Sequence, residues 1–487
     1  MKSKKNRSSF IINFVKKNFI PISIALVFAI AYLTLSLVKH YSYLSGYDLS
    51  IIDQAIWKYS RFLNPISTTH VYYDDPIYFD HLELVLILLS PIYWIFNNVM
   101  AIIVLQVVSV IASGLAVFLL AKKYGLKNIV ANTLFITYLA FFGLQFAIWS
   151  DVHTLVFAVG FLSWFLYFLE CKKTKLTYLF LILSIICKED IALLTLLISI
   201  TYFLKNRTKT SIISGTISLL YLVFVFFIYF PNVVPGGYHF ANPNGLLSDI
   251  NPYYLIDSVD KQKTFLYSLG WFGFLPLLSF VYLIPFLGDL GHYFVLGHIA
   301  IRTEGIFLHY RSTVGLLLVW PTIITISKFK ILNNWKTALY LLICAAILQY
   351  YLHLPLSYLS KKYFWAIPPE VFNINQMIKL VPGDASLVTQ INIGAHLAHR
   401  KELYTLFPSL RDFKTNSPCG TSTCRWFRVG GNPKYLLIDS GSIWNSLHYL
   451  GSRDDFMNGI TNMERNKNIT LIKQIGTTKL YKILNKI

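Results

Sequence analysis

Charged residues are scarce in this sequence. Only 14% of the 487 residues are Asp, Glu, Lys or Arg, whereas a soluble domain usually has about 25%. The hydrophobic share is 55% and the mean hydropathy is +0.54. So few charges could not cover the surface of a water-soluble fold of this length, and so many apolar residues exclude a disordered chain. The composition predicts a protein that crosses the membrane several times.

Cysteine is also scarce, with five residues, which excludes a disulfide-rich secreted scaffold. Cys171, Cys187 and Cys344 lie in or beside apolar segments, where cysteine acts as a small buried hydrophobe. Cys419 and Cys424 share a polar loop. A zinc site there would need two further ligands at suitable spacing. A disulfide between the two cysteines and a pair of free thiols are therefore the two alternatives that remain open.

Nucleotide-binding and hydrolase motifs are missing from the sequence. It has no Walker loop, no dinucleotide fingerprint, no serine nucleophile elbow and no zinc-protease motif. ATP-driven transport and hydrolase chemistry therefore have no support in the sequence.

Basic residues are plentiful, and the formal net charge is +20. They gather in short runs between apolar segments, which is the positive-inside pattern of cytoplasmic loops and does not indicate a nucleic-acid partner. The first apolar stretch, 19–38, follows six basic residues with no acid before it. We interpret it as an uncleaved first span with a cytoplasmic N-terminus. The predicted location is the cell membrane.

A helix needs about 20 apolar residues to cross the bilayer. Glu83–Phe96 and the pair 176–187 and 191–204 are ambiguous because they are shorter. Basic runs flank the pair on both sides, which predicts a hairpin that enters and leaves from the cytoplasm. We estimate ten or eleven passes in all. The clear candidates are 19–38, 99–121, 129–149, 154–169, 211–230, 265–287, 314–326 and 337–352.

The chain changes character near residue 361. Residues 1–360 form the predicted transmembrane domain, with an external loop at 39–82, and residues 361–487 form a small extracytoplasmic α/β domain. Within this domain, the sequence predicts strands at 386–391, 434–438, 469–475 and 479–483, and helices at 373–380 and 443–450.

The loop at 39–82 is locally acidic in a strongly basic protein. Its segment 46–57 predicts an amphipathic helix that lies at the membrane interface. Asp48 stands just before this helix, either as an N-cap or as a general base at the mouth of a membrane cavity. Asp53 is about 140° further around the helix. The two carboxylates therefore do not share a face, and a solvated polar face is the alternative role of Asp53.

Asp80, His81 and Glu83 stand at the entrance to the next apolar segment. Oxygen and imidazole ligands of this kind could hold a divalent cation such as Mg²⁺ or Mn²⁺, with Asp74 or Asp75 as further ligands. The alternative is that these polar residues only satisfy the start of a helix.

Several ionisable residues lie within or next to predicted spans. Charges at membrane depth cost several kcal/mol unless they are paired or face a wet cavity, so each is a candidate for substrate binding. Lys188 could instead pair with Glu189 or Asp190 to tie two half-helices together. The candidates are Asp151, His153, Lys188, Glu189 and Asp190.

A later polar cluster surrounds glycine-rich turns. Its arginine and histidine side chains would suit an anionic phosphate near the membrane boundary. The cluster comprises His292, His298, Arg302, Glu304, His309 and Arg311.

Several short motifs recur in the order found in a prokaryotic family of multi-pass membrane proteins of unknown function, which this sequence resembles over nearly its whole length. They are Gly-Tyr-Asp-Leu at 46–49, Asp-Gln-Ala-Ile-Trp at 53–57, Asp-His at 80–81, Ser-Asp-Val-His at 150–153, Cys-Lys-Glu-Asp at 187–190, Ala-His-Leu-Ala-His-Arg at 395–400 and Tyr-Leu-Leu-Ile-Asp at 435–439.

That family is similar to the GT-C class of integral-membrane glycosyltransferases. The resemblance implies an acid in the first external loop that activates the acceptor, a polyprenyl-phosphate-linked sugar as donor, and an external C-terminal domain. Asp48 occupies the matching place after the first span. The class often has adjacent acids there, whereas here Leu49 follows and the next acid is Asp53.

The leading hypothesis is a GT-C-like transferase in the lipid bilayer that moves a sugar to a glycan, lipid or protein acceptor. Asp48 would be the base and Asp53 its substitute. Asp80, His81 and Glu83 would line the acceptor side or hold the cation, and Lys188, His309 and Arg311 would neutralise the donor phosphate. The alternatives are a transporter or lipid-handling protein without transfer, and a non-catalytic scaffold.

Overall fold

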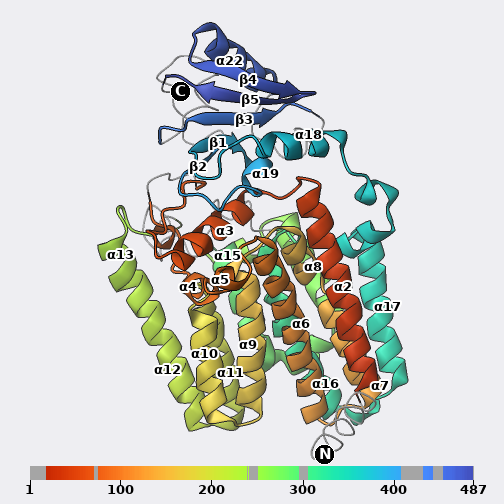
Figure 1. Cartoon of the computed structure of the whole chain (residues 1–487). Coiled ribbons are helices and arrows are strands. Elements are labelled where there is room, and N and C mark those ends of the chain that lie inside the picture. Colours follow the sequence, from red (N-terminus) through yellow and green to blue (C-terminus); the bar gives the residue numbers. More distant parts are fainter. Residues whose placement is uncertain are drawn as a thin grey trace, which may run out of the picture. The chain divides into compact units, whose positions relative to one another are not determined.

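The computed structural model describes residues 18–70, 75–238, 240, 251–295, 305–406, 431–441 and 453–485. Helices dominate it (Figure 1). The chain divides into two compact units. The helical unit comprises Met1–Leu35, Val104–Trp149 and Thr154–Leu359, and the sheet unit comprises Ser36–Ile103, Ser150–His153 and Ser360–Ile487.

Apolar helices form most of the helical unit. The first, α2 (Phe19–Tyr41), begins in this unit, and α6 (Met100–Lys123) ends there with Lys122 and Lys123 in its last turn. The others are α7 (Asn128–Leu139), α8 (Phe142–Trp149), α9 (Thr154–Glu170), α10 (Thr174–Ile185), α11 (Ile191–Asn206), α12 (Lys209–Val223), α13 (Phe230–Val233), α14 (Val259–Trp271), α15 (Ile284–Phe294), α16 (Val314–Lys328) and α17 (Trp335–Tyr351).

The described residues contain several helices that are long and apolar enough to cross a membrane, which confirms the predicted polytopic helical class. There are four by length and composition, or five if α7 and α8, bent by 41° at their junction, form one broken span. Further apolar helices are shorter, and the total of ten or eleven passes stays a prediction. The four are Phe19–Tyr41, Met100–Lys123, Lys209–Val233 and Leu275–Phe294.

The prediction of one span at 265–287 is wrong. Helix α14 ends at Trp271, and two residues with left-handed backbone follow, Gly273 (φ +58°) and Phe274 (φ +57°). Consecutive left-handed residues end an α-helix. A Cβ on Gly273 would lie 2.3 Å from a ring carbon of Tyr340, so close packing also requires glycine there. A separate apolar helix then runs over Leu275–Phe294.

The ambiguous segment 83–96 forms two short helices in the sheet unit. Helix α4 (Val85–Leu89) ends before Pro91, and α5 (Ile92–Ile95) follows. Each is far shorter than a membrane span.

A five-stranded mixed sheet forms the C-terminal part of the sheet unit and confirms the predicted C-terminal domain class. The strand order is β2-β1-β3-β5-β4. Strand β1 pairs in parallel with β2 and β3, whereas β5 pairs antiparallel with β3 and β4. The strands are β1 (Leu387–Gln390), β2 (Leu403–Leu406), β3 (Tyr435–Asp439), β4 (Ile469–Ile475) and β5 (Thr478–Ile483).

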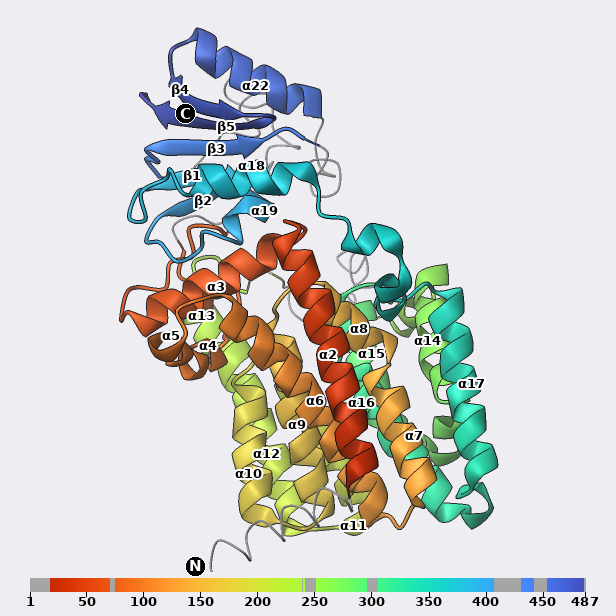
Figure 2. The same ribbon diagram turned by 45° about the vertical axis from the view of Figure 1, so that its right-hand side comes forward.

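Helices cover both faces of this sheet (Figure 2). Side chains alternate between the faces along a strand, so Leu387 and Leu437 join a cluster with α18 (Pro369–Ile378). Their neighbours on the strands pack with α22 (Arg453–Arg465) instead. The sequence predicted α18, but it did not predict β2 or α22, and the predicted helix at 443–450 lies outside the described residues.

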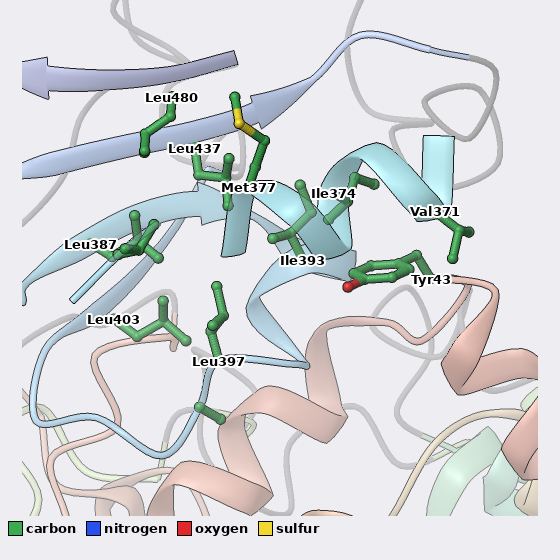
Figure 3. Packing of buried hydrophobic residues seen from close by; sticks show 12 residues of the cluster. Tyr43, Val371, Ile374, Met377, Leu387, Ile393, Leu397, Leu403, Leu437 and Leu480 are labelled. Atoms are coloured by element: carbon green, nitrogen blue, oxygen red, sulfur yellow. The ribbon is translucent and has the colours of Figure 1, made fainter. Parts of the chain in front are cut away.

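The loop after α2 contributes to the hydrophobic core of the sheet domain. Tyr43 is 1% exposed and belongs to the cluster that contains Val371 and Ile374 of α18 (Figure 3). Its hydroxyl donates a hydrogen bond to Asn375 Oδ1 at 2.8 Å. The first loop and the C-terminal domain therefore fold as one unit, although more than 300 residues separate them in the sequence.

Candidate functional site

Helix α3 (Tyr47–Ser60) is held at its start by Asp151. One carboxylate oxygen of Asp151 lies 2.6 Å from Lys39 Nζ, at the end of α2, and the other accepts the Gly46 N–H at 2.8 Å. Gly46 is the N-cap, and its N–H is one of the donors at the start of a helix that have no partner within the helix, so Asp151 supplies the acceptor. A Cβ at position 46 would lie 2.8 Å from Asp151 Oδ2. Asp151 thus joins Lys39, in the last turn of α2, to the start of α3.

The electrostatics of Asp151 fit this framework role. Burial raises the pKa of the Asp151 carboxyl, and the Lys39 ammonium acts in the opposite direction. The residue has φ +118°, a conformation that non-glycine residues adopt rarely and that needs support from surrounding structure. These contacts account for a charged residue that the sequence predicted as substrate-binding.

Asp48 lies in the first turn of α3, where its negative charge interacts favourably with the helix dipole. The alternative that it is the N-cap is wrong, since Gly46 holds that position. Its side chain is 49% exposed, and its Oδ2 lies 3.8 Å from His153 Nε2. An accessible carboxylate beside a buried imidazole is an arrangement that can accept a proton from a bound hydroxyl.

The pKa of Asp48 is raised above its ordinary value of 3.8. The largest cause is partial removal of the carboxyl from water, which disfavours its charged form. Repulsion from the Asp80 charge raises the pKa further. His70, Lys39 and His81 act in the opposite direction. A raised pKa moves a carboxylate toward the range of an effective general base.

Asp80 and two histidines complete what we call the Asp48 cluster (Asp48, His70, Asp80, His81 and His153). Asp80 Oδ2 lies 3.5 Å from His70 Nε2 and 4.0 Å from His81 Nε2. The sequence predicted Asp80, His81 and His153 but not His70, whose only local signal is its place in the acidic loop.

The predicted divalent-cation site gains no support from this geometry. Within the described ranges, no three His, Cys, Asp or Glu side chains converge as metal ligands would. Glu83 precedes α4, where its carbonyl accepts the Leu86 N–H. Asp74, which was a further candidate ligand, lies outside the described residues.

Asp53 is buried, so the alternative that it lies on a solvated polar face is wrong, whereas the position of α3 at the membrane interface stays a prediction. Ten of the 14 residues of α3 are buried, Asp53 among them at 1% exposure. Its Oδ1 accepts hydrogen bonds from the Tyr93 hydroxyl and, at 2.9 Å, from His399 Nε2. Residues from the C-terminal domain cover the polar face of the helix, so Asp48, and not Asp53, is the accessible acid.

A second polar cluster lies in the helical unit, at the junction of α10 and α11. Asp190 Oδ2 is 3.5 Å from Lys188 Nζ and 3.6 Å from His292 Nε2, and it accepts a hydrogen bond from the Tyr293 hydroxyl at 3.3 Å. Glu189 is fully buried and accepts a hydrogen bond from the Tyr238 hydroxyl at 3.0 Å. The pairing of Lys188 with Asp190 matches the structural alternative from the sequence.

Arg311, in the short helix η6 (His309–Arg311), is completely buried. Its guanidinium carbon lies 5.1 Å from the ring centres of both Tyr293 and Phe294. His309 packs against the ring of Tyr310 instead. We call Lys188, Glu189, Asp190, Asp289, His292, Tyr293 and Arg311 the Arg311 cluster.

Asp289 was not predicted from the sequence. It is 1% exposed, accepts a hydrogen bond from the Thr313 hydroxyl at 2.8 Å, and lies in the apolar span Leu275–Phe294. The sequence did contain a signal for it, because an acid within an apolar span is a candidate for a functional site. His298, Arg302 and Glu304, and the two cysteines proposed for a disulfide, Cys419 and Cys424, lie outside the described residues.

The fold is similar to that of a solved membrane protein. The crystal structure of ArnT from Cupriavidus metallidurans bound to undecaprenyl phosphate matches with a TM-score of 0.52 and 10% sequence identity, over 96% of this chain and 98% of that one. ArnT is a GT-C glycosyltransferase. At this identity the likeness shows the fold alone, and it confirms the GT-C-like architecture expected from the sequence.

Comparison of sequences gives the family. No curated protein matches this chain significantly. Residues 39–418 match the family described as "Predicted membrane protein (DUF2079)", over a range that includes both the Asp48 cluster and the Arg311 cluster. The chain therefore belongs to the DUF2079 family of predicted membrane proteins.

Proposed function

We propose that this protein is a membrane glycosyltransferase that uses a polyprenyl-phosphate-linked sugar and has Asp48 as its general base. The observation that carries the proposal is the position of Asp48 in an ArnT-like fold. It is a half-exposed carboxylate with a raised pKa, in the first turn of the helix that follows the first span.

The chemistry assigns one role to each partner of Asp48. The carboxylate takes the proton from an acceptor hydroxyl while the hydroxyl oxygen attacks the anomeric carbon of the sugar. The bond between that carbon and the lipid phosphate breaks, and the phosphate leaves with the electron pair. His153, 3.8 Å from Asp48, then takes the proton from the protonated carboxyl. General-base catalysis of this kind contributes about 10²–10⁴-fold to a rate.

The donor side of the proposal rests on two observations. The structural neighbour ArnT was solved with undecaprenyl phosphate, and Lys188 and His309 of this chain carry positive or protonatable groups outside the long apolar spans. These two residues would meet the phosphate. Arg311 is completely buried against aromatic rings, so we assign it to support of that region and not to phosphate contact. The acceptor would be a glycan, lipid or protein on the outer face of the membrane.

Complementation of a deletion strain tests the proposal. Wild type, Asp48→Asn and Lys401→Ala, an exposed control, are expressed at matched membrane levels, and surface glycans and lipids are profiled by mass spectrometry. We expect a sugar-modified species to be lost in the deletion, restored by wild type and by Lys401→Ala, and not restored by Asp48→Asn. Full restoration by Asp48→Asn would exclude this residue as the base.

A second candidate function is lipid handling without bond formation. Broken helices and buried charges at membrane depth are features of transporters, and this chain has the bent pair α7–α8 and Asp289 within an apolar span. An unchanged glycan and lipid profile in the deletion strain, combined with altered distribution of polyprenyl phosphate between the leaflets, would favour this function.

A further inference from the structure

Residues 396–405, which we call the clasp segment, join the C-terminal domain to the first loop. Thr68 Oγ1 donates to the Leu403 carbonyl at 2.7 Å and accepts the Leu403 N–H at 3.0 Å. Thr405 Oγ1 donates to the Thr69 carbonyl at 3.0 Å. Gln54 of α3 donates from Nε2 to the Arg400 carbonyl at 3.1 Å. The segment therefore bonds to α3 and to the chain that follows it.

Two histidines of the clasp segment meet the first loop through their rings. His396 stacks at 3.9 Å on both His40 and Tyr43, and burial holds the pKa of His396 well below its ordinary value, so its ring is neutral. His399 packs between Trp57 and Tyr93, with ring centres 6.0 and 4.7 Å away. Both rings come from the Ala-His-Leu-Ala-His-Arg motif, which the proposed transfer reaction does not use.

The polar centre of this interface is the bond between His399 and Asp53. The Tyr93 hydroxyl donates to Asp53 Oδ1, and the Nε2 of His399 forms a hydrogen bond with the same oxygen at 2.9 Å. The Asp53 side chain is 2% exposed and that of His399 is 21% exposed. A polar group buried this deeply destabilises the fold unless its hydrogen bonds are complete. His399 therefore contributes, with the Tyr93 hydroxyl, to the rotational position of α3 about its axis.

Rotation of α3 controls the position of Asp48. Asp48 and Asp53 are five residues apart on the same helix, so a turn of the helix moves both carboxylates. A displacement of about 1 Å at a reacting group can cost about 10²-fold in rate. Neither His399 nor Asp53 has to touch a substrate to produce such an effect.

We propose that His399 is a positioning residue, which holds α3 through Asp53 so that Asp48 points at the acceptor. This inference rests on the proposed function of Asp48. The inference gives the C-terminal domain a part in the transfer step, because that domain supplies the His399 side chain that bonds to Asp53.

Kinetics of the full-length protein with four variants test the inference. His399→Ala removes the donor, His399→Gln restores an N–H at the place of Nε2, Asp53→Asn alters the acceptor, and Lys401→Ala is an exposed neighbour with no part in the bond. We expect kcat to fall about 10²-fold in His399→Ala, with the KM for a polyprenyl-phosphate sugar unchanged. His399→Gln should recover most of the loss, and Lys401→Ala should match wild type.

Hydrogen exchange of the same proteins gives a readout that does not depend on activity. Amides of α3 should exchange faster in His399→Ala than in wild type or His399→Gln, while amides of β1 and β3 should be unchanged. Unchanged exchange in α3, or a kcat loss that His399→Gln does not recover, would overturn the positioning role. If α3 exchanges faster but the wild type transfers no sugar, the proposed function fails while the structural role of His399 stands.

Discussion

The two polar clusters of this protein differ in how much of their charge is accessible. In the Asp48 cluster, the key carboxylate is 49% exposed, and the nearby ion pair between Lys39 and Asp151, at 2.6 Å, holds the start of the helix that carries it. In the Arg311 cluster, Glu189 and Arg311 are fully buried and Asp289 is 1% exposed. Similar residue types thus occur in two different settings.

The difference indicates which cluster can supply the general base and which one, Lys188 apart, mainly supports structure. A group that exchanges protons with a substrate must be accessible, and its pKa must suit the reaction. Buried groups have little freedom to contact a ligand, but their removal leaves their charged neighbours with fewer compensating partners. Substitutions in the two clusters should therefore separate activity from stability.

The largest expected effect is that of Asp48→Asn on activity. It should lower the transfer rate by about 10²–10⁴-fold, measured with purified protein and a synthetic lipid-phosphate sugar. Its thermal unfolding temperature at pH 7 should stay equal to that of wild type or rise. Because folding raises the pKa of Asp48, the ionised form opposes stability above the unfolded pKa, and asparagine removes this opposition. A large fall in the unfolding temperature of Asp48→Asn would show that Asp48 stabilises the fold, and the two clusters would then not differ in their effects on activity and stability.

Arg311→Leu should have the opposite profile. Removal of the buried Arg311 cation takes away one of the groups that stabilise the Asp289 charge and leaves His292 and the Thr313 hydroxyl as its partners, at a cost of up to about 3–5 kcal/mol. The unfolding midpoint in detergent measures it. The double variant Arg311→Leu/Asp289→Asn should recover part of the loss, because no isolated charge remains. If Arg311→Leu were as stable as wild type, Arg311 would not stabilise the Asp289 charge as we describe.

Much of the fold could be predicted from the sequence, because long apolar runs and alternating strands are local patterns. The division at Gly273 and Phe274 escaped prediction because hydropathy does not report backbone conformation. Strand β2 is only four residues long, and its identity depends on pairing with β1. Helix α22 had a usable signal in the spacing of Phe456, Ile460 and Met463, which all face one core.

The site was less predictable because its contacts are distant in sequence. Asp53 and His399 are 346 residues apart, so nothing near Asp53 indicates that it is buried. The partner of Lys39 is Asp151, 112 residues away. Asp48 could be identified from its place after the first span, whereas the residues that position it depend on tertiary structure.

A smaller effect concerns the pH dependence of transfer. The Asp80 charge helps raise the pKa of Asp48, so Asp80→Asn should lower it. A base must be ionised to act, and the acid limb of the pH–rate profile should therefore move to lower pH in this variant. Initial rates from pH 4 to 8 measure the shift. Lys401→Ala, at an exposed position outside the Asp48 cluster, is the control. If the acid limb of Asp80→Asn moved to higher pH instead, the Asp80 charge would not raise the pKa of Asp48 in the way that the cluster predicts.

The smallest expected effect is that of Tyr43→Phe, which removes one hydrogen bond between the first loop and α18. The hydroxyl donates to Asn375 Oδ1 at 2.8 Å, and the ring packs in the core of the sheet domain. Phenylalanine keeps the packing and should cost about 0.5–1.5 kcal/mol, visible as a small fall in unfolding temperature with little change in activity. Tyr43→Ala should cost several-fold more, because it also leaves a cavity beside Ile374. If Tyr43→Phe reduced transfer as strongly as His399→Ala, α18 as well as the clasp segment would control the position of Asp48.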